Sequence, residues 1–147
     1  MALTPSFSDA DLAAQLAESA GKILLAVRDS RLIDGKVLGE VGDQIANQFL
    51  IRAIHEQRPD DGLLSEESKD TPERLSRSRV WIIDPVDGTR EYGEERTDWA
   101  VHVGLAVDGA PVLGAVAFIW PESRAASAFL HERIQLPASL VCFALCG

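Results

Sequence analysis

The chain has 147 residues, of which 14 are basic and 23 acidic, and its formal net charge is −9. This length suits one domain with a substantial core. The acidic balance and the lack of a basic tract argue against a nucleic-acid polymer as partner, although a bound cation would still admit a small phosphorylated substrate.

Neither end of the chain predicts export or membrane insertion. Residues 1–5 lack the basic segment and apolar core of a signal peptide. The apolar run over 136–146 is too short to span a bilayer and contains Pro137. We therefore expect a cytoplasmic protein without a transmembrane segment.

The first sixty residues predict two helices. Ser8 is a candidate N-cap, and apolar residues recur at helical spacing over 9–29. Asp34–Gly35 marks a turn, followed by a short extended piece at 37–38. Asp43 then opens a second helix, which Pro59 ends.

Short apolar runs farther along the chain predict strands. Asp108–Gly109 between two such runs is a strong hairpin signal. The expected strands are Leu63–Leu64, Val80–Ile83, Trp99–Val107 and Val112–Ile119, with a surface loop at 67–78. Residues 124–135 are compatible with a helix. Helices followed by mostly antiparallel strands predict an α+β fold built in layers.

Two carboxylates, Asp84 and Asp87, follow the run at 80–83 in a turn built around Pro85 and Gly88. Pro85 stiffens the backbone, and Gly88 permits a tight turn from which a short helix can begin. Free N–H groups at that helix start would face an anion. Hard carboxylate oxygens suit Mg²⁺. The alternative is an ordinary turn with solvated acids.

Glu66 and Glu67 end another predicted strand, 18 residues before Asp84. Taken alone, they fit a solvated strand end. If the two strand ends met at one rim of the sheet, their carboxylates would repel one another unless a cation lay between them. Together with the turn at Asp84 and Asp87, they favour a divalent-metal site.

Asp43 has two compatible roles. It can cap the second helix, and it can bind Thr89 and orient a water that attacks phosphorus.

The segment Ser65-Glu66-Glu67-Ser68, followed by Trp81-Ile82-Ile83-Asp84-Pro85-Val86-Asp87-Gly88-Thr89, resembles the inositol monophosphatase superfamily of Mg²⁺-dependent, lithium-sensitive phosphatases. The resemblance implies the layered α/β sandwich of the inositol monophosphatase and fructose-bisphosphatase type. It also implies two or three Mg²⁺ ions. The first would be bound by Glu66, Asp84 and the carbonyl of Val86, and the second by Asp84 and Asp87.

The same resemblance implies the remaining roles. Asp43, Thr89 and Glu66 would be catalytic, with Asp43 and Thr89 activating the attacking water. The substrate would be bound by Asp87, Gly88, Thr89 and Arg90, although a surface salt bridge is an equal alternative for Arg90.

The segment Arg90-Glu91-Tyr92 resembles the 3'(2'),5'-bisphosphate nucleotidases of the CysQ type. The implied substrate is 3'-phosphoadenosine 5'-phosphate, a by-product of sulfate assimilation, released as AMP and phosphate. An inositol monophosphatase-like or fructose-bisphosphatase-like activity is the alternative among enzymes. A catalytically inactive fragment that binds metal or phosphate is the alternative from another class.

The sequence departs from the family in its tail. Family members have a second half that supplies a further metal-binding Asp, whereas no Asp follows Asp108 here. We therefore expect residues 1–121 to form the N-terminal portion of the phosphatase fold and residues 122–147 a divergent tail that matches no known part of it. One ligand of the second metal would then be lacking. Many members of the family form dimers, so a homodimer is compatible with the resemblance.

Overall fold

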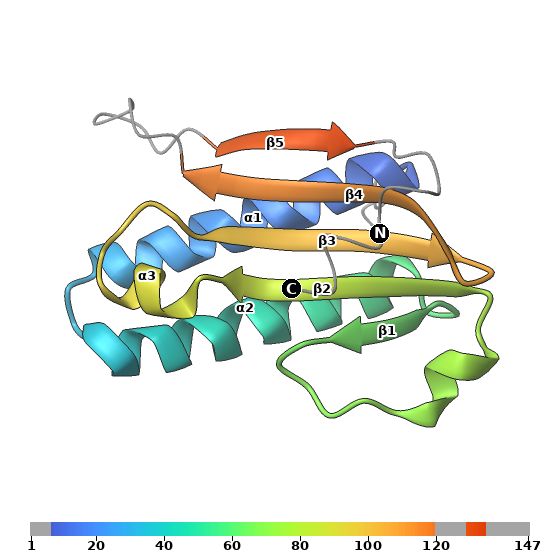
Figure 1. The fold of residues 1–147 in the computed structure, drawn as a ribbon, viewed down its shortest axis with the longest axis horizontal. Coiled ribbons are helices and arrows are strands. Elements are labelled where there is room, and N and C mark those ends of the chain that lie inside the picture. The colour runs from blue at the N-terminus through green and yellow to red at the C-terminus, as the bar shows by residue number, and fades with distance from the viewer. Residues whose placement is uncertain (1–6, 120–128, 135–147) are drawn as a thin grey trace, which may run out of the picture.

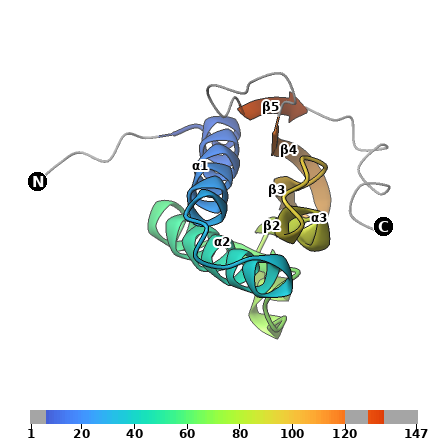
Figure 2. The same ribbon diagram turned by 90° about the vertical axis from the view of Figure 1, so that its left-hand side faces the viewer.

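The structure is a computed structural model that describes residues 7–119 and 129–134, in which two long helices cover one face of a five-stranded sheet (Figures 1 and 2). This arrangement confirms the α+β class. In chain order the elements are α1 (Asp9–Asp29), α2 (Gly35–Gln57), β1 (Gly62–Ser65), the 3₁₀ helix η1 (Pro72–Ser76), β2 (Arg79–Asp87), α3 (Thr89–Gly93), β3 (Ala100–Val107), β4 (Ala110–Ile119) and β5 (Phe129–Ile134).

The strands lie side by side in the order in which they occur along the chain. β1 pairs with β2 in parallel, and the other three pairings are antiparallel. The predicted hairpin between β3 and β4 is confirmed, with Asp108 and Gly109 both at positive φ in its turn. Because β1 and β2 run in the same direction, their C-terminal ends meet at one edge of the sheet (Figure 1).

Helix α1 begins and ends where its sequence pattern predicts. The Ser8 hydroxyl accepts a hydrogen bond from the Asp11 backbone N–H at 3.0 Å, which confirms the N-cap. One side of the helix, including Leu12, Leu16 and Leu24, is buried against the sheet. Among the described residues, no helix is long and apolar enough to cross a membrane.

Helix α2 begins eight residues earlier than predicted, so the predictions of an extended piece at 37–38 and of Asp43 as an N-cap were wrong. Asp34 takes the N-cap position, and Asp43 lies in the interior of the helix. Three glycines in its first turns disguised the helix, because glycine is a poor helix former.

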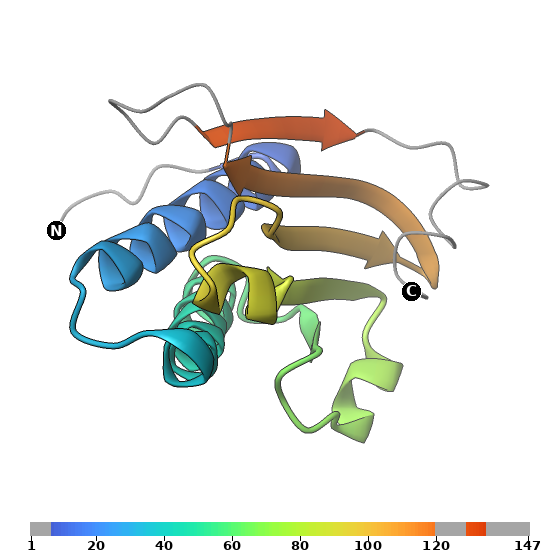
Figure 3. The ribbon, with the colours of Figure 1, turned by 60° about the vertical axis from the view of Figure 1, so that its left-hand side comes forward.

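Two of the glycines of α2, Gly39 and Gly42, are explained by close packing against α3, which follows β2 and lies beside the first half of α2 (Figure 3). A Cβ at Gly39 would lie 3.0 Å from Thr89 Cγ2, and a Cβ at Gly42 would lie 2.5 Å from Tyr92 Cε1. Tertiary packing therefore outweighs helix propensity at these positions.

The core lies between the helices and the sheet. The buried positions alternate along the strands, with Trp81 and Ile83 in β2 and Val101, Val103 and Leu105 in β3. This period of two is the signature of a sheet that is covered on one face.

The helix considered for residues 124–135 is wrong where the structure describes them, because residues 129–134 form strand β5 against β4. Backbone pairing with the neighbouring strand, which local periodicity does not report, decided this segment. Residues 124–128 and 135 of the considered helix lie outside the described part of the chain. The predicted surface loop at 67–78 contains the short η1 helix.

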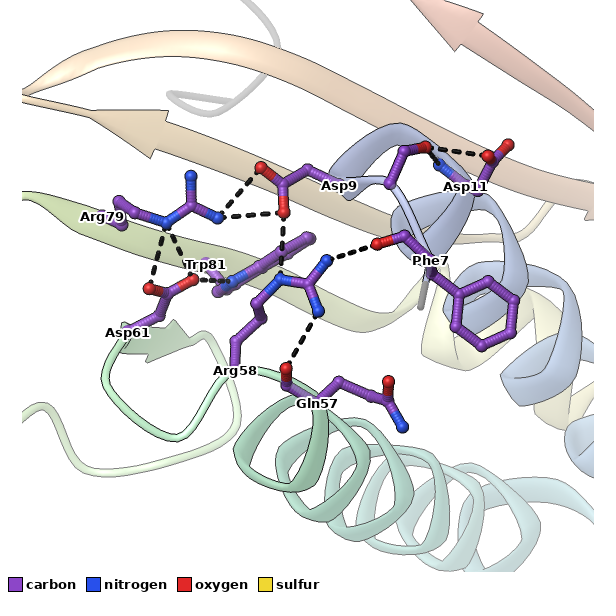
Figure 4. A network of polar contacts seen from close by, with 9 residues as sticks. Phe7, Asp9, Asp11, Gln57, Arg58, Asp61, Arg79 and Trp81 are labelled. Atoms are coloured by element: carbon purple, nitrogen blue, oxygen red, sulfur yellow. Dashed lines mark hydrogen bonds and ion pairs between the residues drawn. The ribbon is translucent and has the colours of Figure 1, made fainter. Parts of the chain in front are cut away.

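A polar network ties together the ends of four elements away from the acidic edge (Figure 4). Asp9 at the start of α1 pairs with Arg58 at the end of α2 and with Arg79 at the start of β2. Asp61, just before β1, accepts hydrogen bonds from Arg79 and from the indole N–H of Trp81. These charge-assisted contacts hold the helices in register with the sheet.

Candidate active site

The acidic segments converge at the edge where β1 and β2 end. Ser65 is paired with Ile83, and the backbone N–H of Glu66 donates to the Ile83 carbonyl at 3.2 Å. The residue that follows this pair is an acid on both sides: Glu66 comes directly after β1, and Asp84 follows Ile83 within β2. The two strand ends meet at one rim of the sheet, as the sequence predicted.

A β-bulge in β2 separates the two aspartates of the turn. Asp84 is paired with His102 and Asp87 with Ala100, so β2 has one residue more than β3 between these pairs. Such a bulge kinks the strand and redirects its side chains. Pro85 fits at this point because a bulged residue need not donate to the sheet.

The Asp84 carboxyl lies in an environment that disfavours its charged form. Its Oδ1 is buried and has no hydrogen-bond partner among the described residues. Burial, followed by the adjacent carboxyls of Glu66 and Asp87, raises the pKa of Asp84 from 3.8 to about 7. An orphaned, buried carboxylate oxygen among other acids is the environment that a bound cation would relieve.

Asp43 and Thr89 are brought together by the contact between α2 and α3. The Thr89 hydroxyl lies 3.2 Å from Asp43 Oδ1 and 3.1 Å from the Val86 carbonyl oxygen, so its one proton can reach either acceptor. Burial and the Glu67 carboxylate raise the pKa of Asp43 to about 6, against the opposing effect of the Thr89 hydrogen bond. A carboxylate with this pKa is suited to accept a proton near neutral pH.

The turn after Asp87 has the predicted form. Gly88 has φ +87°, and a Cβ there would lie 3.0 Å from the Asp98 carbonyl oxygen, so the position favours glycine. The short helix predicted from this point is α3.

Two of the residues predicted to bind metal or substrate contact other side chains of the chain instead. Asp87 is 63% exposed, and its Oδ2 lies 3.2 Å from Nε2 of His102. Arg90 is 79% exposed and forms an ion pair with Glu94 at 2.8 Å. Sequence reasoning left His102 without a role. The pairing of β2 with β3 brings His102 to the site, and no local pattern reports that pairing.

Sequence reasoning also missed Asn47, which is buried in α2 behind Glu66 and Glu67. Its side chain binds Ser65 and Ser68. Tyr92, part of the motif that resembles nucleotidases, is a core residue here: its hydroxyl donates to the Leu24 carbonyl oxygen at 2.7 Å.

The oxygen donors fit a hard divalent cation. Within 7–119 and 129–134, no three His, Cys, Asp or Glu side chains converge closely enough to form a preassembled metal site. Glu66 and Asp84 are adjacent, whereas Asp87 is turned toward His102. All donors in question are carboxylate or carbonyl oxygens, which suit Mg²⁺ rather than zinc.

An open cavity of about 530 Å³ adjoins the turn. It is lined by Asp87, Gly88, Glu91, Thr97, Asp98, Trp99, Ala100 and Phe118. Three of these residues are acidic and none is basic, so a phosphate entering here would be repelled unless a cation offset the charge.

Comparison with known proteins relates the chain to one family of phosphatases. The model of the inositol monophosphatase family matches residues 8–136. A 3'-phosphoadenosine 5'-phosphate phosphatase of Mycobacterium leprae is 50% identical over 100 residues, which are 67% of this chain and 37% of that protein. The 3'(2'),5'-bisphosphate nucleotidase CysQ of Salmonella typhimurium is 32% identical over 69% of this chain and 44% of its own length.

Solved structures agree on the fold. CysQ from Bacteroides thetaiotaomicron, described as a bacterial member of the inositol monophosphatase family, superposes with a TM-score of 0.66 at 21% identity, covering 90% of this chain and 51% of that one. SuhB of Mycobacterium tuberculosis has a TM-score of 0.59 at 28% identity, covering 72% of this chain and 38% of that one. The chain thus spans less than half the length of the two sequence relatives.

Proposed function

We propose that this chain, which belongs to the inositol monophosphatase family, acts as a Mg²⁺-dependent phosphate monoester hydrolase. One observation carries the proposal: the orphaned Asp84 Oδ1 lies at the rim shared with Glu66, and the Glu66 carboxylate acts on Asp43 as well as on Asp84. Both the oxygen donors for a cation and a proton acceptor are thereby brought to one edge of the sheet.

The residues divide into two groups by chemistry. Glu66, Asp84, Asp87 and the Val86 carbonyl would hold Mg²⁺. When bound, the ions supply the positive charge that stabilises the oxygens of an in-line displacement at phosphorus.

Asp43 and Thr89 would handle the proton. The Thr89 hydroxyl donates toward Asp43 at 3.2 Å, which leaves its oxygen lone pairs available to accept a hydrogen bond from the attacking water. As the water oxygen bonds to phosphorus, the water would pass a proton to the Thr89 oxygen and Thr89 would pass its own proton to Asp43. The ester P–O bond breaks, and the leaving alkoxide takes a proton from solvent. Gly88 and Thr89 at the turn would position the phosphate.

The proposed substrate is 3'-phosphoadenosine 5'-phosphate, hydrolysed to AMP and phosphate. Support comes from the relative of that name at 50% identity and from the nucleotidase CysQ. A cytoplasmic location, a part in sulfate assimilation, sensitivity to lithium and homodimer formation belong to the same proposal. Arg90 is a proposed substrate contact, for which Glu94 is the competing partner.

Phosphate release tests the function directly. The full chain is assayed with Mg²⁺ and 3'-phosphoadenosine 5'-phosphate, inositol 1-phosphate or fructose 1,6-bisphosphate, beside an Asp84→Asn variant. We expect release from the adenosine compound that depends on Mg²⁺ and is lost in the variant.

Other outcomes decide against parts of the proposal. A preference for the inositol or fructose ester would refute the nucleotidase assignment. Equal background release from both proteins would refute the enzyme, and Mg²⁺ binding without turnover would identify the chain as an inactive metal-binding fragment.

A further inference from the structure

The turn that carries Glu66 and Glu67 is hydrogen-bonded to one buried side chain, that of Asn47. Residues 65–68 form a β-turn in which the Ser68 backbone N–H donates to the Ser65 carbonyl oxygen at 3.3 Å. The Ser65 hydroxyl donates to Asn47 Oδ1 at 2.6 Å, and Asn47 Nδ2 donates to the Ser68 hydroxyl at 2.8 Å. The Asn47 amide therefore bridges the first and last residues of the turn.

Burial makes this bridge strong and specific. Asn47 and Ser65 are each only 5% exposed. A buried polar group that loses its partner costs about 1–3 kcal/mol, so the turn cannot shift without leaving amide or hydroxyl groups unpaired. The Ser65 hydroxyl oxygen also accepts a hydrogen bond from the Glu67 backbone N–H at 3.2 Å, which extends the network to the acidic segment.

An amide is well suited to this place. It donates to one hydroxyl and accepts from the other at the same time. It also adds no charge beside Glu66 and Glu67, where a further carboxylate would increase the repulsion and a lysine would compete for the acids that a cation needs.

Asn47 also links the two parts of the site. It follows Asp43 by four residues in α2, so both side chains lie on the same face of the helix. Asp43 binds Thr89 at the start of α3, and Asn47 binds the turn after β1. One rigid helix thus sets the distance between the proton acceptor and the acidic turn.

We propose that Asn47 is a positioning residue, which holds the Ser65–Ser68 turn so that the Glu66 carboxylate is presented beside Asp84. This inference rests on the proposed function for the purpose of the turn, but the clamp itself can be measured without turnover. Partners that orient metal ligands typically change metal affinity by about 10- to 100-fold when removed.

The experiment compares the full chain with Asn47→Ala and with Gln48→Ala, a change at the next, exposed position of α2. Mg²⁺ alone is titrated into each protein by calorimetry, and amide hydrogen exchange is followed at residues 66–68. We expect Asn47→Ala to weaken Mg²⁺ binding about 10- to 100-fold and to accelerate exchange at those amides. Gln48→Ala should change neither.

One combined result would overturn the inference. An Mg²⁺ affinity within about twofold of wild type, together with unchanged exchange at residues 66–68, would show that Asn47 does not position the turn. If Asn47→Ala does not fold, Ser68→Ala removes only one of the two bridging contacts and decides by the same readouts.

The failure of the proposed metal site has a different signature. In that case the wild-type chain binds no Mg²⁺, and the Asp84→Asn variant gives the same flat titration. Hydrogen exchange then decides the inference alone: faster exchange at residues 66–68 in Asn47→Ala upholds the clamp, and equal protection refutes it.

Discussion

The environment of the Asp84 carboxyl predicts that a mutation in the candidate active site increases the stability of the metal-free chain. Replacing Asp84 by Asn removes a buried negative charge that has Glu66 and Asp87 as neighbours and an Oδ1 without a partner. In the absence of divalent metal, we therefore expect Asp84→Asn to stabilise the folded chain at alkaline pH.

The magnitude follows from the pKa. A rise from 3.8 to about 7 corresponds to about 4 kcal/mol at most between the charged and neutral forms. The side chain is only partly buried, and solvent screening reduces this figure to about 2 kcal/mol. For a domain of this size, that gain in the free energy of unfolding raises Tm by about 6 °C.

The effect depends on pH with a definite sign. Because the folded pKa of Asp84 lies above the unfolded value, its bound proton stabilises the folded state. That contribution is complete below about pH 4 and is lost as the pH rises through about 7. Asp43, with a pKa of about 6, acts in the same direction. The metal-free wild type should therefore lose stability between these pH values, and Asp84→Asn should lose less.

The assay is thermal unfolding in chelator at pH 4 and pH 8, with Asp60→Asn as a matched change at an exposed site. Saturating Mg²⁺ at about 100 times its Kd should then stabilise the wild type by about 2.7 kcal/mol and the Asp84→Asn variant hardly at all. Equal Tm values for wild type and Asp84→Asn at pH 8 in chelator would refute the reasoning. So would a lower Tm for the variant.

Three further changes test the surroundings of the site. Thr89→Val removes the hydroxyl that binds Asp43 and should lower Mg²⁺-dependent phosphate release about 100-fold or more, whereas Thr89→Ser should retain most of it; equal loss in both would contradict the role of the hydroxyl. Gly42→Ala places a Cβ 2.5 Å from Tyr92 Cε1 and should cost about 1–3 kcal/mol in urea unfolding; an unchanged midpoint would show that α3 can move away. Tyr92→Phe removes the buried hydroxyl that donates to the Leu24 carbonyl oxygen and should cost about 1–2 kcal/mol with KM unchanged; a raised KM would assign the hydroxyl to the substrate instead.

Local signals in the sequence were sufficient for several elements. The Ser8 cap and the apolar spacing after it predicted α1 with its observed bounds, because a cap and a helical stripe both act within a few residues. The hairpin at Asp108–Gly109 was predicted for the same reason. The meeting of Glu66 and Asp84 also followed, since two strands of an α+β sheet that carry acids at their ends have few ways to pair.

The errors have a common cause in packing between distant segments. The start of α2 was misplaced because Gly39 and Gly42 weaken helix propensity, and the value of a small residue there becomes visible only with α3 against it. Strand β5 was missed because it is decided by pairing with β4. Neither contact leaves a periodic trace in its own segment.

The sequence by itself determined which acids belong to the candidate site, because the carboxylates, the stiff Asp84–Pro85 step and Gly88 with its φ of +87° are local features of one short motif. Only the tertiary structure decided how those acids are tuned and held. Desolvation of Asp84, the pairing of Asp87 with His102 and the Asn47 bridge under the acidic turn arise where separate elements meet. A pKa and a rigid orientation depend on the surroundings in space, and these are assembled only when the chain is folded.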